Sequence, residues 1–522
     1  VMFMVRLAEL QLLHGSEFKR VANSNRTFSR YLIPPRGVFV DRNGVRLVEN
    51  EPLYKITTED SKDLPYPKFV ETSRDEALQM LQNSSREVII DQRRVYLYPE
   101  ALMHLLGYIG EVTREELQLN SSLSPGRNIG KSGLEFLLES RLSGVLGLEQ
   151  YEMHATGRLR DQLSVRSPIA GESHQLSIDA EFSQKAYEAL AGRKGAVVVI
   201  DPRDGSVLAM VSSPSFSRDT LVEAIQDDDR PLINRAIHAT YPPGSIFKMI
   251  PAIAALQYGN VQADTLIEDT GVLRVGEFEF RNWFYRQYGR TDGMLDLVGA
   301  LRRSNDIYFY KIAEYAGIEN IARTAELFGL GKQTGIDLAG ERTGLIPTPA
   351  WKQQRLGEPW YLGNTYHVGI GQGDVLMTPL QASVMTGAIA TGRLCEPRIL
   401  SINNRQCRDI EIPLEILDPI RKGMKQATEP GGTAYPFFDG QVGEIGGKTG
   451  TSEFGPADSA GRRSTHAWFV AFAPFDNPQL SITVFLEADL DGGDSARFLE
   501  GSHHASPIAK ELLLWWQQEY GF

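Results

Sequence analysis

The chain has 522 residues, of which 42% are hydrophobic and 23% charged, a balance typical of a globular protein in water. This length exceeds what one hydrophobic core supports, and roughly 150 residues per domain predicts about two to four structural units. The net charge of -12 and the lack of any long run of Lys and Arg argue against a nucleic-acid-binding surface.

The N-terminus begins with an apolar stretch, Val1 to Val5, that Arg6 interrupts. A membrane span needs roughly 20 apolar residues, so the stretch as it stands is no span. It is either the outer end of an anchor or the start of a capped helix, and the sequence leaves both open. Apolar positions at helical spacing from Arg6 to about Phe28 then predict a helix or stalk.

The next part of the chain alternates β-rich and helical patterns. Asn43-Gly44 separates two β-rich runs, 34–40 and 45–48, and predicts a hairpin with both turn residues at positive φ. Residues 71–140 predict a helix-rich insertion in an elongated, β-containing region. Its helical patterns lie near Asp75–Leu81, Pro99–Leu106 and Gly133–Leu142.

Two segments imitate a phosphate-binding loop. That loop needs a glycine five residues before its Gly-Lys pair. Pro125 stands at this position before the pair at 130–131, and Val442 stands there before the pair at 447–448. Both segments therefore fail, and a P-loop nucleotidase is excluded.

From Leu176 onward the pattern predicts a sheet built from distant segments. The middle, from Gly259 to about Ile420, is largely helical, and Ile508–Tyr520 is an amphipathic closing helix. Strands at both ends with helices between them predict an antiparallel sheet sandwiched by helices. The predicted strands are Ala196–Ile200, Ser206–Ser212, Ile445–Phe454, Thr465–Ala473 and Leu480–Ala488.

The segment from Tyr241 to Ile250 is the one around which the functional hypothesis is built. Two prolines and a glycine prevent a helix before Ser245, and an almost wholly apolar run predicts a buried helix that ends at Gly259 and kinks at Pro251. Ser245 and Lys248 then lie one turn apart. A buried ammonium is costly, so the lysine is either paired or neutral, and a neutral amine beside a hydroxyl activates a nucleophile. Taken alone, such a serine is more often a helix cap.

Two further segments contain polar groups in suggestive order. Ser304 and Asp306 can face one side only if the backbone between them is not helical. In the predicted strand Lys448-Thr449-Gly450-Thr451, alternate residues share a face, and Gly450 allows another backbone or a substrate to approach closely. Taken separately, Ser304 is best interpreted as a turn residue, Lys448 as a surface charge and Thr449 as a β-forming residue.

Together, the three segments resemble the signature of penicillin-binding proteins and serine β-lactamases: Ser-x-x-Lys, then Ser-x-Asn or a variant, then Lys-Thr-Gly. Arg36-Gly37 and Asp41–Gly44 resemble the N-terminal pedestal of class B penicillin-binding proteins, which β-lactamases lack. No glycosyltransferase-type acidic motif precedes the pedestal, which disfavours the bifunctional class A. Transpeptidase-like segments also occur at 368–373, 378–381 and 431–434.

Within class B, three segments resemble the elongation-specific branch, penicillin-binding protein 2: 336–338, 351–355 and 360–361. The division-specific branch is the alternative. The resemblance implies an α+β multidomain fold. Residues 1–175 would be a pedestal domain of dimerisation or partner type, with a helix-rich head near 71–140. Residues 176–522 would be a penicillin-binding transpeptidase domain, with an antiparallel sheet between helices and an all-helical subdomain.

The resemblance also implies acyl transfer on peptides that end in D-alanyl-D-alanine. Ser245 would attack the penultimate carbonyl, neutral Lys248 would take its proton, and Ser304 would relay a proton to the leaving D-alanine. Backbone N–H groups of Ser245 and Thr451 would form the oxyanion hole. The terminal carboxylate would be held by Lys448, Thr449 and Thr451, with Gly450 between them.

The second motif departs from the family pattern. Its third residue is usually Asn, whereas this chain has Asp306, which can only accept hydrogen bonds when ionised. The elongation branch is similar in carrying Asp here, so Asp306 is kept in the predicted site, with Lys248 as its candidate partner.

No cofactor or metal is implied, and no Cys-x-x-Cys or His-Glu-x-x-His spacing occurs. Cys395 and Cys407 are either bonded, in an oxidising compartment, or two buried thiols.

The expected partners are peptidoglycan stem peptides, lipid-linked precursor, β-lactams and, through the pedestal, a RodA-type membrane glycosyltransferase and elongation-complex proteins, but no nucleic acid. The expected location is the bacterial inner membrane, with a single N-terminal anchor outside this chain and a periplasmic catalytic domain.

Several alternatives compete with this interpretation. A serine β-lactamase-type hydrolase or a penicillin-sensing protein would share the site, and rapid hydrolysis of the acyl-enzyme would identify the former. A Ser-His-Asp hydrolase would need a Gly-x-Ser-x-Gly elbow, which surrounds neither Ser245 nor Ser132. A scaffold that binds polymerase partners through residues 1–175 is compatible with the same chain.

Overall fold

The computed structural model describes residues 3, 6, 9–14, 16, 27–58, 68–83, 88–120, 123, 125–153, 159–400, 406–438 and 440–522. The chain forms two compact units that interleave along the sequence. The first comprises Val1–Val40, Arg46–Leu97 and Leu106–His174, and the second comprises Asp41–Val45, Tyr98–Leu105 and Gln175–Phe522. The predicted domain division after residue 175 stays a prediction.

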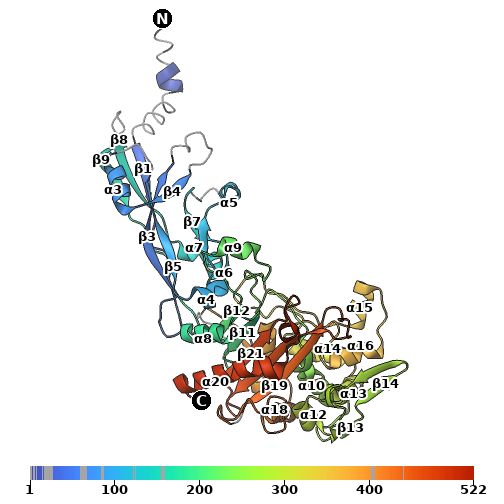
Figure 1. The fold of residues 1–522 in the computed structure, drawn as a ribbon. Coiled ribbons are helices and arrows are strands. Elements are labelled where there is room, and N and C mark those ends of the chain that lie inside the picture. The colour runs from blue at the N-terminus through green and yellow to red at the C-terminus, as the bar shows by residue number, and fades with distance from the viewer. Residues whose placement is uncertain are drawn as a thin grey trace. The chain divides into compact units, whose positions relative to one another are not determined.

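The first unit is built on two small antiparallel sheets (Figure 1). One has the order β1-β8-β9, and the other has the order β4-β3-β5. Their strands are β1 (Thr27–Leu32), β8 (Gly147–Met153), β9 (Leu159–Arg166), β4 (Phe69–Thr72), β3 (Val48–Thr57) and β5 (Val88–Tyr96). The other elements up to residue 175 are β2 (Phe39–Val40), α3 (Arg74–Asn83), α4 (Pro99–Leu106), β6 (Ile109–Glu111), α5 (Arg114–Leu119), β7 (Asn128–Gly130), α6 (Gly133–Leu137), α7 (Glu139–Leu142) and β10 (His174–Gln175).

The helix-rich insertion is confirmed by α3, α4, α6 and α7. The predicted stalk lies largely outside the described residues, within which Glu9–Leu13 forms one π-helical turn. The predicted turn near residue 44 is present, but only Gly44 has a positive φ, of 85°, and Asn43 does not. The reason is that the carboxylate of Asp41 accepts hydrogen bonds from the N–H groups of Asn43 and Val45, which makes a longer, side-chain-supported turn.

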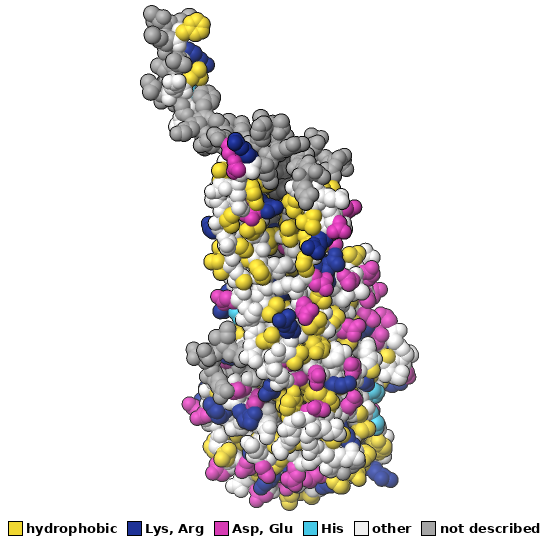
Figure 2. Space-filling model, turned by 90° about the vertical axis from the view of Figure 1, so that its left-hand side faces the viewer, with side chains coloured by type: hydrophobic (Ala, Val, Ile, Leu, Met, Phe, Trp, Pro, Cys, Tyr) yellow, Lys and Arg dark blue, Asp and Glu magenta, His cyan; other side chains and the backbone are white. Residues whose placement is uncertain are grey.

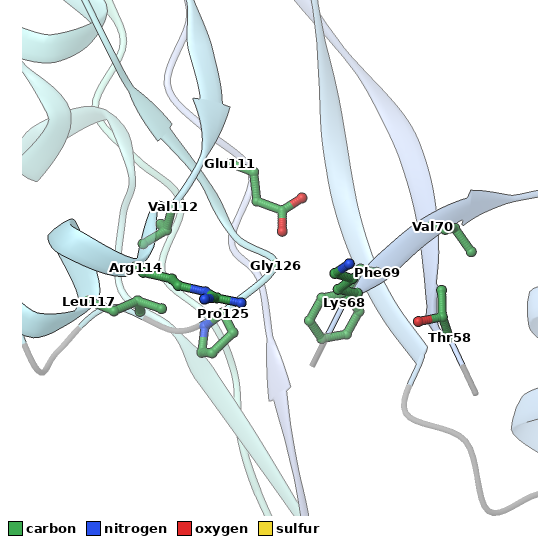
Figure 3. A pocket seen from close by; sticks show the side chains of 10 residues that line it. All are labelled: Thr58, Lys68, Phe69, Val70, Glu111, Val112, Arg114, Leu117, Pro125 and Gly126. Atoms are coloured by element: carbon green, nitrogen blue, oxygen red, sulfur yellow. The ribbon is translucent and has the colours of Figure 1, made fainter. Parts of the chain in front are cut away.

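A cavity of about 300 Å³ lies within the first unit. Figure 3 shows its lining side chains, among them Glu111 and Arg114 on one wall and Lys68 and Phe69 on the other. Its one lining hydroxyl is that of Thr58, and no histidine lines it.

The second unit is built around a five-stranded, wholly antiparallel sheet of order β12-β11-β21-β20-β19. Its strands are β11 (Gly195–Ile200), β12 (Val207–Ser213), β19 (Gly446–Phe454), β20 (Ser464–Ala473) and β21 (Leu480–Leu486). All five predicted strands are therefore present, to within two residues at each end. Figure 1 shows the green β11 and β12 beside the red and orange strands of the C-terminal segment.

Two hydrophobic cores cover the two faces of this sheet. Alternate residues of a strand point to opposite faces, and β20 accordingly sends Phe469 into one core and Trp468 and Val470 into the other. The first of these cores is closed by α8 (Ala180–Leu190) and α20 (Ser506–Tyr520), and the second by α10 (Met249–Tyr258) and α17 (Pro379–Thr391). The expected helical sandwich is confirmed.

The region between the strands is largely helical, as expected, and it also contains small hairpins. Its helices are α9 (Leu221–Gln226), α11 (Trp283–Tyr288), α12 (Leu297–Arg303), α13 (Asp306–Ala316), α14 (Ile318–Leu327), α15 (Pro349–Leu356), α16 (Leu362–Gly369) and α18 (Leu414–Thr428). Its strands are β13 (Ile267–Asp269), β14 (Val272–Val275), β15 (Phe278–Arg281), β16 (Gly293–Leu295), β17 (Arg393–Cys395) and β18 (Cys407–Asp409). Near the C-terminus lie α19 (Asp494–Arg497) and a π-helical turn, Gly501–Ala505.

Two expectations about the helix after Ser245 need correction. The segment begins as a 3-10 helix, Gly244–Lys248, and continues as α10, with Gly259 as its C-cap as predicted. Pro251 lies in the first turn of α10, where a backbone N–H has no intrahelical partner to lose. The physical reason for the expected kink is therefore absent.

The structure also decides between the alternatives for the cysteines, because Cys395 and Cys407 form a disulfide. On the face in Figure 2, acidic and basic side chains are interspersed and form no large basic patch. Within the described part of the chain, no helix has the length and apolar character needed to cross a membrane.

Candidate active site

The nucleophile segment is fitted closely against the edge of the sheet. Gly244 has a φ of +58°, and a Cβ on it would lie 2.5 Å from the carbonyl oxygen of Thr451. Gly450 of β19 faces the same segment, since a Cβ there would lie 2.9 Å from Ile246 and 3.0 Å from the carbonyl oxygen of Pro243. The close approach expected at Gly450 is thus made by the side chain of Ile246 and the backbone of Pro243, and it places Ser245 beside β19.

Lys248 is wholly buried and bonded on three sides. Its Nζ donates to Asp306 Oδ1 at 2.7 Å, to the carbonyl oxygen of Ser304 at 2.7 Å and to Ser304 Oγ at 3.3 Å. Burial lowers the pKa of Lys248 below its usual value, and the negative charge of Asp306 partly offsets this. The predicted pairing of Lys248 with Asp306 is present.

The backbone around Ser304 explains how residues two apart can face one site. Ser304 ends α12 in the left-handed conformation, with a φ of 53°, and Asn305 is the extended N-cap of α13. Asn305 Oδ1 accepts from the N–H of Tyr308 at 3.0 Å, and its Nδ2 donates to Asp292 at 3.1 Å. Because the chain reverses here, Ser304 and Asp306 both reach Lys248.

Lys448 approaches the same serine from β19. Its Nζ donates to Ser304 Oγ at 2.8 Å and to the carbonyl oxygen of Thr449 at 3.0 Å. Burial, together with repulsion from the charge of Lys248, holds the pKa of Lys448 well below its usual value. Two amines from distant segments therefore share one hydroxyl oxygen, and that geometry supplies a route for a proton through Ser304.

The remaining predicted residues lie along the edge strand. Thr449 Oγ1 donates to Thr433 Oγ1 at 2.8 Å, and Thr451 is exposed. The carbonyl oxygen of Thr451 accepts from Gln372 Nε2 at 3.4 Å. Within the described residues, no hydrogen bond joins Ser245 Oγ to Lys248 Nζ; the amine is occupied by Ser304 and Asp306. Hydrogen bonds of this kind commonly tighten only when a substrate is bound.

Several bracing residues were missed from the sequence. The N–H of Trp283 donates to Asp306 Oδ2 at 2.8 Å, and Asn282 Oδ1 accepts from the N–H of Asp306 at 3.1 Å. Asp292 pairs with Arg303 at 2.9 Å. These are single polar residues on separate hairpins and helices, so no spacing pattern could have identified them. Within the described part of the chain, no three His, Cys, Asp or Glu residues cluster so as to hold a metal.

Comparisons with known proteins agree with this geometry. Residues 195–513 match the model of the penicillin-binding protein transpeptidase domain, and residues 83–176 match that of the penicillin-binding protein dimerisation domain. The chain is 32% identical to the peptidoglycan D,D-transpeptidase MrdA of Haemophilus influenzae, over 97% of this chain and 87% of that protein.

Solved structures show the same architecture. The penicillin-binding protein PBP2 of Helicobacter pylori, in complex with MreC, superposes with a TM-score of 0.83 at 26% identity, covering 95% of this chain and all of that one. A chain from a peptidoglycan synthase complex that coordinates polymerization and crosslinking superposes with a TM-score of 0.77 at 26% identity, covering 98% of this chain and 95% of the other.

Proposed function

The chain belongs to the class B penicillin-binding proteins, and from this premise we propose that it is a serine-type peptidoglycan D,D-transpeptidase of cell elongation. The observation that carries the proposal is the convergence of three segments on one hydroxyl. Ser304 Oγ accepts from Lys248 and from Lys448, and the nucleophile segment of Ser245 packs against the same edge strand. The similarity to relatives named MrdA and PBP2 favours this branch over the division-specific one.

The proposed chemistry assigns each group a role. Ser245 attacks the penultimate D-alanine carbonyl of a stem peptide, and the neutral form of Lys248, which burial favours by lowering the pKa of the amine, takes the hydroxyl proton. Ser304 passes a proton to the leaving D-alanine, and Lys448 stabilises that serine and the peptide's carboxylate. Asp306 positions Lys248. A side-chain amine of a neighbouring stem peptide then takes the acyl group and forms the cross-link.

The remaining groups bind the peptide. The N–H groups of Ser245 and Thr451 would stabilise the oxyanion, and removal of one such donor typically costs about 3 kcal/mol. Thr449 and Thr451, on either side of Gly450, would hold the terminal carboxylate along β19. β-Lactams would occupy the same place and stop the reaction at the acyl-enzyme.

We further propose a location and partners. The catalytic unit would be periplasmic, held at the bacterial inner membrane by an N-terminal anchor. The disulfide supports the periplasmic location, because such bonds persist in oxidising compartments. Residues 1–175 would form the pedestal that contacts a RodA-type glycosyltransferase and elongation proteins. A relative solved with MreC and another from a synthase complex support an assembly of this kind.

Brief exposure to benzylpenicillin tests the proposal. We expect the intact mass to increase by one penicillin, with Ser245 as the modified residue, and the adduct to persist for hours. Ser245→Ala should give no adduct, and Lys248→Ala should fold but acylate at least about a hundredfold more slowly, because a general base contributes that much. An unlabelled native protein would refute the assignment, and an adduct lost within minutes would indicate a β-lactamase-type hydrolase.

A further inference from the structure

The segment 431–434 resembles a transpeptidase sequence, but the chemistry above gives it no role. Its Thr433 is bonded to both walls of the site. The backbone N–H of Thr433 donates to the carbonyl oxygen of Arg302 at 3.2 Å, two residues before Ser304. The side-chain oxygen of Thr433 accepts from Thr449 Oγ1 of β19 at 2.8 Å. Thr433 therefore lies between the end of α12 and the edge strand that borders the site.

The segment that carries Thr433 is held in place by the end of α12. Arg302 Nη2 donates to the carbonyl oxygen of Pro430, and Arg303 Nη1 donates to that of Gly431 at 3.1 Å. These two arginines are the last residues of α12 and directly precede the serine that both lysines contact. The position of Thr433 is thus fixed by the same helix end that fixes this serine.

The hydroxyl protons of the two threonines are used differently. A threonine hydroxyl has one proton to donate and two lone pairs that accept. Thr449 donates its proton to Thr433 Oγ1. Within the residues that the structure describes, the hydroxyl of Thr433 accepts this bond and donates none. The pair therefore has one proton left for a ligand, and this proton belongs to Thr433.

Thr433 is also the more accessible of the two threonines. Thr449 is buried, with 7% of its surface exposed, whereas Thr433 is only partly buried. A hydroxyl that already accepts a hydrogen bond is polarised by it and donates more strongly. A ligand at this place would therefore meet the hydroxyl of Thr433, strengthened as a donor by Thr449.

The chemistry of the neighbouring groups favours an anionic ligand. Lys448 precedes Thr449 on β19, and the terminal carboxylate of the donor peptide is proposed to lie along this strand. Hydrogen bonds from a hydroxyl to a carboxylate are assisted by charge and are roughly twice as strong as those between neutral groups. A free hydroxyl proton at this place is suited to such a carboxylate.

We propose that the hydroxyl of Thr433 donates to the terminal carboxylate of the donor peptide, and that Thr449 is a positioning residue that acts on this carboxylate through Thr433. The inference rests on the proposed transpeptidase function, and it refines the role given there to Thr449. It adds to the site a binding residue from outside the three motifs that identified the family.

Benzylpenicillin and its methyl ester, which lacks the carboxylate, test the proposal in competition for the same protein. Intact mass separates their two adducts on Ser245, which differ by one CH2 group, and the ester is supplied in excess. The native protein should prefer the free acid. Thr433→Val, which removes the hydroxyl at nearly constant volume, should lower this preference about fivefold or more, because it deletes a hydrogen bond to a charged group.

Further variants separate a hydroxyl effect from a packing effect. Thr433→Ser keeps the hydroxyl and should stay within about twofold of the native preference. Thr449→Val should lower the preference less than Thr433→Val, because Thr433 keeps its proton and loses only the group that polarises it. A larger loss in Thr449→Val than in Thr433→Val would show that Thr449 donates directly, and it would overturn the proposal.

Thr391→Val is the matched control. Thr391 is a partly buried threonine at the end of α17, and its hydroxyl donates to the carbonyl oxygen of Gly387 at 2.9 Å. Its variant should keep the native preference for the free acid. Each readout is a ratio of two adducts within one variant, so a loss of folded protein cancels.

The outcomes distinguish the inference from the function beneath it. The native preference retained in Thr433→Val, or no preference in the native protein, would overturn the inference while leaving Ser245 as the nucleophile. Equal losses in Thr433→Ser and Thr433→Val would also overturn it, because the change would not follow the hydroxyl. If neither compound forms an adduct on Ser245, the proposed transpeptidase function fails, and the inference fails with it.

Discussion

At the scale of single residues, the site depends on how Ser304 Oγ is shared. The oxygen accepts from Lys248 at 3.3 Å and from Lys448 at 2.8 Å. A hydroxyl oxygen has two lone pairs, so both are occupied and the hydroxyl proton must point to a third group. Asp306 takes up the remaining capacity of Lys248, which is why an acceptor-only carboxylate is accommodated where the family usually has an amide.

The pH dependence of acylation tests the balance of charges on Lys248. The amine is a base only when neutral, so the acylation rate rises with pH as it loses its proton. Burial lowers the pKa of Lys248 and the charge of Asp306 raises it. Asp306→Asn removes the raising effect, so the rising limb of the rate should move to lower pH.

Penicillin acylation followed by mass across a pH series measures this limb. Asp458→Asn is the matched control, because Asp458 is a carboxylate paired with Arg462 at 3.1 Å on the loop between β19 and β20. In Asp458→Asn, the acylation rate should rise over the same pH range as in the native protein. A limb that moves to higher pH in Asp306→Asn would contradict the role assigned to the carboxylate.

At the scale of elements, helix ends and strand edges position the chemistry. The end of α12 at Ser304 and the start of α13 at Asn305 form one reversal, and the 3-10 turn before α10 brings the segment of Ser245 to β19. Each of these segments departs from α-helical backbone: Ser304 is left-handed, Asn305 is extended, and Gly244–Lys248 is a 3-10 helix. Local geometry, rather than a flexible loop, therefore holds the polar groups in place.

The disulfide between β17 and β18 should stabilise its hairpin without affecting catalysis. Cys395 and Cys407 are 12 residues apart, and cross-linking a loop of this size stabilises a protein by about 3 kcal/mol in the chain-entropy description. The double variant Cys395→Ala, Cys407→Ala should lose about 2 to 3 kcal/mol of unfolding free energy. Its penicillin acylation rate should be unchanged, because the hairpin contributes no residue to the site.

Urea denaturation with and without a reductant checks this expectation. The reductant should destabilise the native protein but leave the double variant unaffected, which serves as the internal control. Equal stability of the oxidised and reduced native protein would show that the hairpin does not depend on the bond.

At the scale of the whole molecule, the first unit has a buried charge network of its own. Glu135 has no exposed surface, and its carboxylate accepts from Arg36 at 2.6 Å and from Arg94 at 2.7 Å. Removal of one member of such a network leaves buried charges unpaired, which typically costs about 3 to 5 kcal/mol. All the groups of the proposed site lie in the second unit. Stability of the first unit and acylation by the second should therefore be separable.

Glu135→Ala tests this separation. Hydrogen exchange in β3 and β5 should accelerate as the first unit loses about 3 to 5 kcal/mol, while acylation of Ser245 stays at the native rate. All six tryptophans lie in the second unit, so the midpoint of tryptophan fluorescence in urea should not move. Glu71→Ala is the control, because its pair with Arg93 is exposed on both sides. Loss of acylation in Glu135→Ala alone would contradict the independence of the two units.

What could be predicted from the sequence was local in character. The strands 196–200 and 465–473 are evident because each is a short, nearly continuous run of apolar and β-forming residues. Lys248 after Ser245 is conspicuous because a charge interrupts an apolar run. The order of the three short motifs identified the family. Corrections arose where a prediction depended on where an element begins, as for Pro251 and for the turn at Asn43.

Only the tertiary structure decided which distant groups meet. It showed the predicted contact of Lys248 with Asp306, let Lys448 reach Ser304 Oγ, bonded the two cysteines and set Arg286 against Glu453. The physical reason is the distance over which each effect acts. Backbone propensity and hydrophobic periodicity depend on residues that are close together in the sequence, so they can be recognised from the sequence alone. Desolvation and ion pairing act between surfaces that come together only when the chain packs, so no local pattern encodes them.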